Sequence, residues 1–210
     1  MTKKITIFIF IYFFCSNVFA GISILGSRFI MNENSLNITI MNDNENEYII
    51  KSEINDDKFI VSPPLFLLSK NSKNIITLVP TEKVTNTMDK VLDLKISAIP
   101  KSKMNEKGNA ISLAIRNNFK LIIRHNRIKD SDFLNLKIEK IDNKFYLLNN
   151  SNFAFTISLT EKEISNKIKI LPPKEKINLG NKCKNSSCNL SIDFYNEFND
   201  VIKKINLSYK

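Results

Sequence analysis

Apolar and polar residues alternate along most of the chain, which is the pattern of β-strands that bury one face. The stretch from Leu36 to Ile40 alternates strictly, and the polar residues 42–46 follow it as a turn. Similar runs recur roughly every ten residues, as in an antiparallel sandwich. In the first half of the chain, the predicted strands cover residues 36–40, 48–54, 59–61, 75–79, 91–99 and 111–123.

A polar stretch from His125 to Asp132 interrupts this rhythm, and strand-like runs resume after it. Each half then holds about seven short strands, which is the content of one immunoglobulin-like sandwich. We therefore predict an all-β protein of two immunoglobulin-like β-sandwich domains, at residues 21–126 and 127–210. In the second half, the predicted strands cover residues 134–138, 145–148, 153–159, 168–170, 177–179, 190–194 and 201–207.

The first twenty residues have the three parts of a secretory signal peptide. Lys3 and Lys4 supply the positive start, residues 5–14 are almost entirely apolar, and Ala20 ends a short segment suited to cleavage. The apolar run is too short to span a bilayer, so we expect export without stable membrane anchoring. Cleavage would also remove Cys15, which leaves two cysteines in the exported chain.

The net charge of +10 comes from 31 Lys and Arg against 21 Asp and Glu. The lysines are interleaved with acids, and no basic cluster carries stacking aromatic residues, so we expect no nucleic-acid binding. Only four of the cations are arginines. Their rarity indicates positions where a planar guanidinium, which can donate two parallel hydrogen bonds, is useful. They are Arg28, Arg116, Arg124 and Arg127.

The few cysteines and the single histidine limit the chemistry of the chain. Cys183 and Cys188 could form a redox pair, but four residues separate them instead of the two of a C-x-x-C motif, which favours a structural disulfide. His125 lies in the polar stretch, where we expect it on the surface. Without a phosphate-binding glycine loop or a metal-spaced cluster, we expect no enzyme, no catalytic residue, no metal and no cofactor.

The last strand of the first half begins with a row of large aliphatic residues. Ile111, Leu113 and Ile115 alternate with small or polar residues, and a polar loop precedes them. Such a strand can be half-buried in its own sandwich. It can also be an exposed edge that offers its side chains to a partner, since a bare edge otherwise aggregates.

Seven short segments follow one another in a recognisable order. They are Gly21–Ile30, Tyr48–Ser52, Phe59–Leu68, Ala98–Pro100, Lys120–Arg124, Leu171–Lys174 and Asn196–Phe198. Together, and behind a signal peptide, they resemble the PapD-like periplasmic chaperones of the chaperone–usher pilus pathway. The resemblance covers essentially the whole exported chain.

The resemblance implies two immunoglobulin-like domains joined at an angle and a periplasmic location. The implied partners are pilin or fimbrial subunits and an outer-membrane usher, and a second copy of the chain could cap the exposed strand as a dimer. Arg28 and Lys120 would bind the C-terminal carboxylate of a subunit. Ile111, Leu113 and Ile115 would form the donor strand that completes the subunit's fold.

Two points remain open at this level. The positions that match the family's interdomain charge network are Thr77, Asp89 and Glu197, and two acids without a cation would repel unless Lys90 lies between them. The interdomain geometry is therefore not predicted. The alternative function is structural, as an exported immunoglobulin-like surface protein or adhesin subunit.

Overall fold

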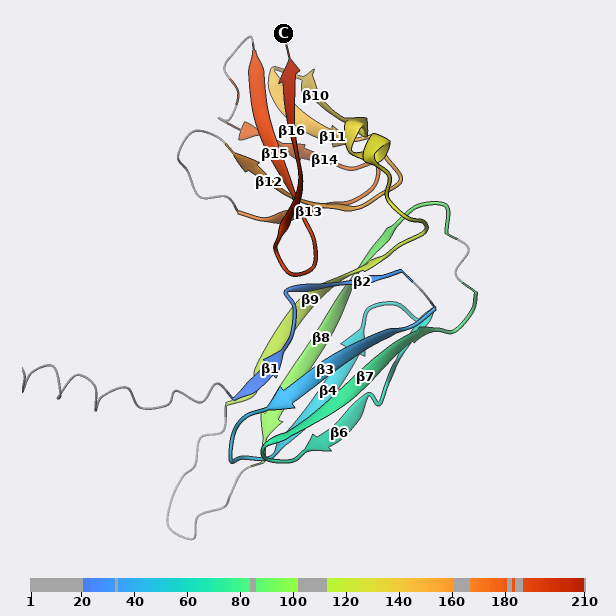
Figure 1. The fold of residues 1–210 in the computed structure, drawn as a ribbon, viewed down its shortest axis with the longest axis vertical. Coiled ribbons are helices and arrows are strands. Elements are labelled where there is room, and N and C mark those ends of the chain that lie inside the picture. The colour runs from blue at the N-terminus through green and yellow to red at the C-terminus, as the bar shows by residue number, and fades with distance from the viewer. Residues whose placement is uncertain are drawn as a thin grey trace, which may run out of the picture.

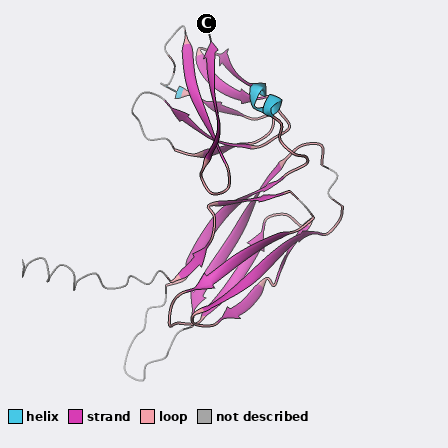
Figure 2. Ribbon diagram, viewed as in Figure 1, coloured by secondary structure: helices cyan, strands magenta, loops and turns pink. Residues whose placement is uncertain are grey.

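The computed structural model describes residues 21–32, 34–83, 86–101, 113–160, 167–180, 183 and 187–209. These residues form two β-sandwiches that follow each other along the long axis of the molecule (Figure 1). Strands dominate both sandwiches, as Figure 2 shows, so the predicted all-β fold of two immunoglobulin-like domains is confirmed. The predicted leader lies outside the described residues, and the exact division at residue 126 stays a prediction.

The first sandwich packs a four-stranded sheet, in the order β1-β3-β7-β5, on a five-stranded sheet, in the order β2-β9-β8-β4-β6. Inward-facing residues such as Ile38, Ile40 and Leu121 form its core. The strands are β1 (Ile22–Ile24), β2 (Arg28–Met31), β3 (Leu36–Asn42), β4 (Tyr48–Ile54), β5 (Phe59–Ser62), β6 (Leu65–Leu68), β7 (Ser72–Pro80), β8 (Lys90–Pro100) and β9 (Ile115–Ile123).

The start of the chain contributes one short strand to each sheet. β1 pairs with β3, and β2 pairs in parallel with the end of β9. The chain crosses between the two sheets at Gly26, whose φ of 112° disfavours any residue with a side chain. This crossing sets β2 against the last strand of the sandwich, where it positions Arg28.

The second sandwich has a three-stranded sheet, β10-β11-β14, and a four-stranded sheet, β13-β12-β15-β16. Its core centres on Phe133, Phe155 and Phe194, whose ring centroids lie 4.8–5.4 Å apart. The strands are β10 (Leu136–Ile141), β11 (Lys144–Asn149), β12 (Phe155–Thr160), β13 (Lys169–Leu171), β14 (Lys176–Asn178), β15 (Cys188–Tyr195) and β16 (Val201–Tyr209).

Several elements differ from the predicted strands. β1, β2 and β6 fall outside the predicted ranges, and β9 begins at Ile115, so that residues 113 and 114 of the predicted strand 111–123 precede it. The 3₁₀ helix η1 (Asp130–Asn135) occupies the expected start of β10, because Phe133 turns into the second core there. The short strands β2 and β6 do not follow a simple alternation: both β2 side chains Arg28 and Phe29 are buried, and β6 is apolar throughout. No helix in the described ranges is both long and apolar enough to cross a membrane.

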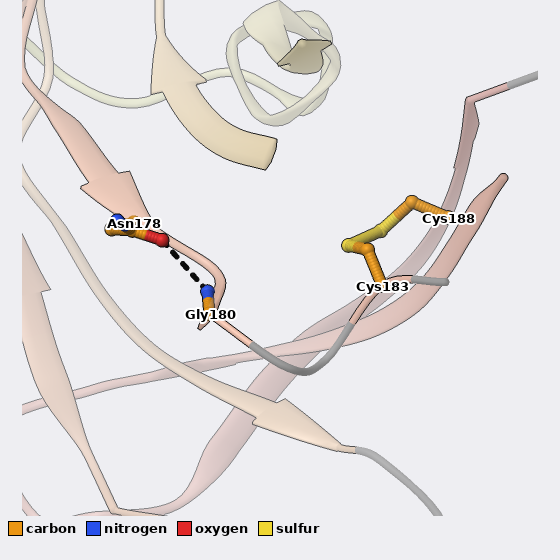
Figure 3. Close-up of a disulfide and its surroundings, with 4 residues drawn as sticks. All are labelled: Asn178, Gly180, Cys183 and Cys188. Carbon is orange, nitrogen blue, oxygen red and sulfur yellow. Dashed lines mark hydrogen bonds between the residues drawn. A yellow bond between two sulfur atoms is a disulfide. The ribbon is translucent and has the colours of Figure 1, made fainter. Parts of the chain in front are cut away.

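Cys183 and Cys188 form a disulfide, as the spacing predicts (Figure 3). Cys188 begins β15 and is buried in the second core, and Cys183 packs against that core. Asn178 accepts a hydrogen bond from the backbone of Gly180 just before this region (2.8 Å). The bridge therefore holds the segment after β14 against the start of β15.

Candidate functional site

A cleft of about 570 Å³ lies where the two sandwiches meet. It brings together the two predicted binding residues, Arg28 of β2 and Lys120 of β9. Its lining residues are Ser27, Arg28 and Lys120 from the first sandwich and Ile168, Lys169, Ile170 and Asn199 from the second. Three of these are cations and none is an acid, so the cleft suits an anionic group that carries its own hydrogen-bond acceptors.

Arg28 and Lys120 are direct neighbours across the pairing of β2 with β9. The parallel register sets Arg28 opposite Lys120 and Met31 opposite Ile123. Adjacent strands lie about 5 Å apart, so both side chains can reach one small anion. Sequence alone suggests Arg28 through its rarity, but only the strand pairing places it beside Lys120.

Arg28 is almost fully buried, with 6% of its surface exposed. Its guanidinium donates hydrogen bonds to the backbone oxygen of Asn196 and to Oδ1 of Asn199, both in the turn between β15 and β16. Burial lowers the pKa of Arg28, and the negative charge of Glu197 opposes that shift. Since an arginine has five N–H donors, the two bonds leave further donors for a ligand.

Lys120 is held by an acid of the neighbouring strand. Its Nζ lies 2.6 Å from Oδ1 of Asp93, which stands opposite Lys120 in the register of β8 and β9. Both side chains are partly exposed to solvent, so this ion pair is weak and its partner can be exchanged. Lys120 can therefore turn towards a carboxylate that enters the cleft.

The other half of β9 is an open edge. Residues 115–123 pair with β8 on one side, whereas β2 covers only residues 120–123 on the other. Within the described part of the chain, no strand pairs with that second side of residues 115–119. Their outward N–H and C=O groups are available for strand addition.

The described donor residues lie at the start of this open edge: Ile115 is the first residue of β9, and Leu113 precedes the strand. Leu113 is 77% exposed and Ile115 is 54% exposed, whereas Phe119 and Leu121, which share the face of Ile115, are buried. On this face of β9, the side chains are therefore buried in the core near Leu121 and exposed to solvent at Ile115. Lys120 occupies the opposite face, as its even position predicts. Ile111 lies outside the described residues.

A buried ion-pair network joins the two sandwiches at Asp89, just before β8. Its Oδ2 accepts hydrogen bonds from Arg124 and from the backbone N–H of Ala154 (2.8 Å). Its Oδ1 accepts the backbone N–H of His125 (3.1 Å) and lies 2.8 Å from that residue's Nδ1. Ala154 belongs to the second sandwich, so the Asp89 carboxylate forms hydrogen bonds with residues of both sandwiches.

The second sandwich presents a preformed turn to Asp89. Fully buried Asn149 donates to the backbone oxygen of Phe153 (2.7 Å), and its Oδ1 accepts the N–H and the hydroxyl of Ser151 (3.0 and 2.6 Å). The Phe153 ring contacts His125, with centroids 4.5 Å apart. This ordered turn offers Ala154 at a defined position, which supports one arrangement of the two domains.

Comparison with known proteins gives the family of this chain. The family model for the N-terminal domain of the PapD pili and flagellar-assembly chaperones matches residues 21–129, more than half of the chain. This chain belongs to the PapD-like chaperones. Members of this family are chaperones, which is a non-enzymatic class. The match therefore favours a chaperone over the alternative of a surface or adhesin subunit.

One similar protein covers nearly the full length of this PapD-like chain, and another covers about half of it. Chaperone protein FanE of Escherichia coli is 28% identical over 220 residues, which span 94% of this chain and 95% of FanE. Chaperone protein LpfB of Salmonella typhimurium is 33% identical over 123 residues, 51% of this chain and 52% of LpfB.

Solved structures confirm the fold. A chain of the Salmonella enterica complex of SafA pilin with the SafB chaperone matches with a TM-score of 0.72 at 19% identity, over 91% of this chain and 97% of that one. The E. coli chaperone DraB matches with a TM-score of 0.69 at 16% identity, over 89% and 95%.

The interdomain network of this PapD-like chain differs from the predicted set. Asp89 belongs to it, but its cation is Arg124, whereas Lys90 pairs with Asp56. Thr77 instead donates to Asn37 within the first sandwich (2.8 Å). Burial lowers the pKa of Arg124, and the charge and hydrogen bond of Asp89 oppose that shift. The charge of Glu197 acts in the same direction as Asp89, but it is the smallest of these effects.

His125 is not the surface histidine that the polar sequence around it suggests. Its side chain is mostly buried between Asp89 and Phe153, because the polar connection folds back into the domain junction. Arg116 donates to Ser97 (3.3 Å), and Arg127 lines a second cavity at the junction. In the described ranges, no three His, Cys, Asp or Glu side chains gather as a metal site would require.

We predict that Asp89→Asn strongly destabilises the protein. The amide removes the counter-charge of Arg124, which is buried, and an uncompensated buried charge costs on the order of 3–5 kcal/mol. Urea denaturation measures the change in the free energy of unfolding. The control is Glu45→Gln in the exposed pair with Lys70, where less than about 1 kcal/mol is expected. An Asp89→Asn protein as stable as the control would contradict the assigned network.

Proposed function

We propose that this chain is a periplasmic chaperone that captures pilin or fimbrial subunits and delivers them to an outer-membrane usher. The observation that carries the proposal is the course of β9: Lys120 stands beside Arg28 in the cleft, and the same strand continues into the open edge at Ile115. One strand thereby combines an anion site with a site for strand addition.

The anion site suits the C-terminal carboxylate of a subunit. Arg28 is held in place and can bind a carboxylate in a bidentate way, and Lys120 adds a second, mobile cation. A chain terminus is a carboxylate that every subunit carries, whatever its sequence. The site therefore binds subunits by a shared feature and places their last residues at a fixed point.

The open edge supports binding of the segment that leads to that terminus. With a rise of about 3.3 Å per residue, Ile115 lies roughly 16 Å along β9 from Lys120. A subunit strand anchored at the cleft can pair with the free backbone groups of residues 115–119. Leu113 and Ile115 then project from this edge and fill an apolar groove in a subunit that lacks its own final strand.

The proposed cycle needs no nucleotide. A subunit exchanges the donor strand of the chaperone for that of another subunit at the usher, and the difference in free energy drives the transfer. The signal-peptide pattern of residues 1–20 indicates export, which supports a periplasmic location for this cycle. The partner of the SafB chaperone in the similar structure is the SafA pilin, which is the class of partner proposed here.

Loss of Arg28 or Lys120 should strongly weaken subunit capture. Arg28→Ala and Lys120→Ala remove a charged donor from the carboxylate, which should weaken binding by about 2–5 kcal/mol. The measurement is co-purification from the periplasm with the organism's own pilin subunits co-expressed. Lys137→Ala is a matched control, because Lys137 is as exposed as Lys120 (53%) and is also paired with an acid, Glu139.

Arg28 also contacts the second sandwich, so the thermal stability of each variant is measured alongside. Folded Lys120→Ala protein that retains the subunit at the wild-type level would contradict the carboxylate site. A wild-type protein that recovers no subunit would overturn the chaperone proposal as a whole.

An acid at the donor edge should abolish binding without unfolding the protein. Leu113→Asp and Ile115→Asp place a charge where an apolar groove would have to bury it, although both side chains are exposed in the free chaperone. Co-purification and thermal unfolding are compared with Leu134→Asp, a 71% exposed leucine of η1. Unfolding of Ile115→Asp would show instead that this residue belongs to the core.

A further inference from the structure

The turn between β15 and β16 reaches from the second sandwich to the cleft arginine. Figure 1 shows it as the red loop that extends from the upper sandwich towards β2. Oδ1 of Asn199 accepts a hydrogen bond from the Arg28 guanidinium and one from the hydroxyl of Ser27 (3.3 Å). The backbone oxygen of Asn196 accepts a second bond from Arg28. Two neutral oxygens of one turn therefore hold the guanidinium.

The turn is ordered by its own hydrogen bonds. Oδ1 of Asn196 accepts the backbone N–H groups of Phe198 (3.0 Å) and Asp200 (2.8 Å). Nδ2 of Asn196 donates to the carboxylate of Asp200 (3.0 Å). Asn199 adopts φ of 69°, a left-handed conformation that asparagine tolerates better than most residues. The two acceptors that face Arg28 are thus fixed before any ligand binds.

The neutrality of these acceptors distinguishes Arg28 from Lys120. Lys120 is paired with the carboxylate of Asp93, which offsets its charge. Arg28 is held by an amide and a peptide oxygen, which fix its orientation, and among the described residues no acid contacts it. An anion that enters the cleft therefore meets a guanidinium whose orientation is already fixed, and it displaces no acid of the described residues from Arg28.

We propose that Asn199 is a positioning residue that aims Arg28 at the carboxylate of the bound subunit. This inference rests on the proposed function and deepens it. Because Asn199 belongs to the second sandwich and Arg28 to the first, the direction of the guanidinium depends on how the two domains are placed. The second domain thereby contributes to binding through Arg28.

The clean test removes the side chain without straining the turn. Glycine adopts a φ near +69° freely, so Asn199→Gly deletes the acceptor and preserves the backbone. The probe is the pilin subunit that co-purifies with the wild-type protein, and its affinity is measured for the wild type, Asn199→Gly, Arg28→Ala and the double variant. Asn199→Gly should weaken binding roughly 5- to 50-fold, by loss of orientation of a charged donor.

The double variant separates positioning from a structural role. If Asn199 acts through Arg28, the Asn199→Gly change has no further effect once Arg28→Ala is present. An equal loss of affinity in both backgrounds, or none in the wild-type background, overturns the inference while the carboxylate site stands. If Arg28→Ala itself binds the subunit like the wild type, the carboxylate role fails and this inference fails with it.

Two further readouts report on Arg28 directly. Asn199→Asp keeps an oxygen acceptor but adds a negative charge beside Arg28, so it should bind the subunit more weakly although the contact and the fold remain. With four arginines in the chain, side-chain NMR can resolve Arg28. Its two terminal nitrogens should give separate signals in the wild type and an averaged signal in Asn199→Gly. Separate signals in Asn199→Gly, or wild-type affinity in Asn199→Asp, would contradict the role of a neutral acceptor.

Discussion

The parallel pairing of β2 with the end of β9 is the constraint on which the rest of the site depends. It covers four residues of β9, from Lys120 to Ile123, and the N–H of Arg124 extends it with a bond to Met31 (2.9 Å). This short pairing sets Arg28 beside Lys120. Because it ends at Lys120, it also leaves residues 115–119 without a second partner strand in the described structure. The cation pair and the open edge thus have one structural cause.

The domain junction has two contacts with different physical characters. At Asp89, a buried carboxylate accepts hydrogen bonds from Arg124, from the backbone N–H of His125 and from a backbone N–H of the second sandwich. These interactions offset the free-energy cost of burying its charge. At Arg28, the contacting acceptors that the structure describes in the second sandwich are neutral oxygens of Asn196 and Asn199, and the charge of Glu197 acts without contact. The first contact therefore stabilises the arrangement of the domains, and the second leaves a cation available in the cleft.

The sequence predicts much of this protein because alternation follows directly from half-buried strands. Strands such as Leu36–Asn42 and Tyr48–Ile54 and the disulfide cysteines follow from local patterns. The 3₁₀ helix at Phe133 does not, because packing against the second core decides its backbone. The burial of His125 depends on contacts with residues far along the chain, so the polar stretch around it is misleading.

The site was predictable only in part for the same reason. Rarity and motif position indicate Arg28, and alternation indicates Leu113 and Ile115. The role of Asn199 has no such local signal, since it arises from contact between residues 171 positions apart. Lys120 resembles the many other lysines by composition and is indicated by motif position alone, and the register of β2 and β9 sets it opposite Arg28.

The most direct test is residue-resolved hydrogen exchange of β9 in the free chaperone and in its complex with a co-purified pilin subunit. The account predicts that alternate amides of residues 115–119, those facing away from β8, become protected in the complex, whereas residues 120–123 are already protected by β2 in the free protein. Unchanged exchange along residues 115–119, with new protection elsewhere, would contradict the claim that this edge receives the subunit.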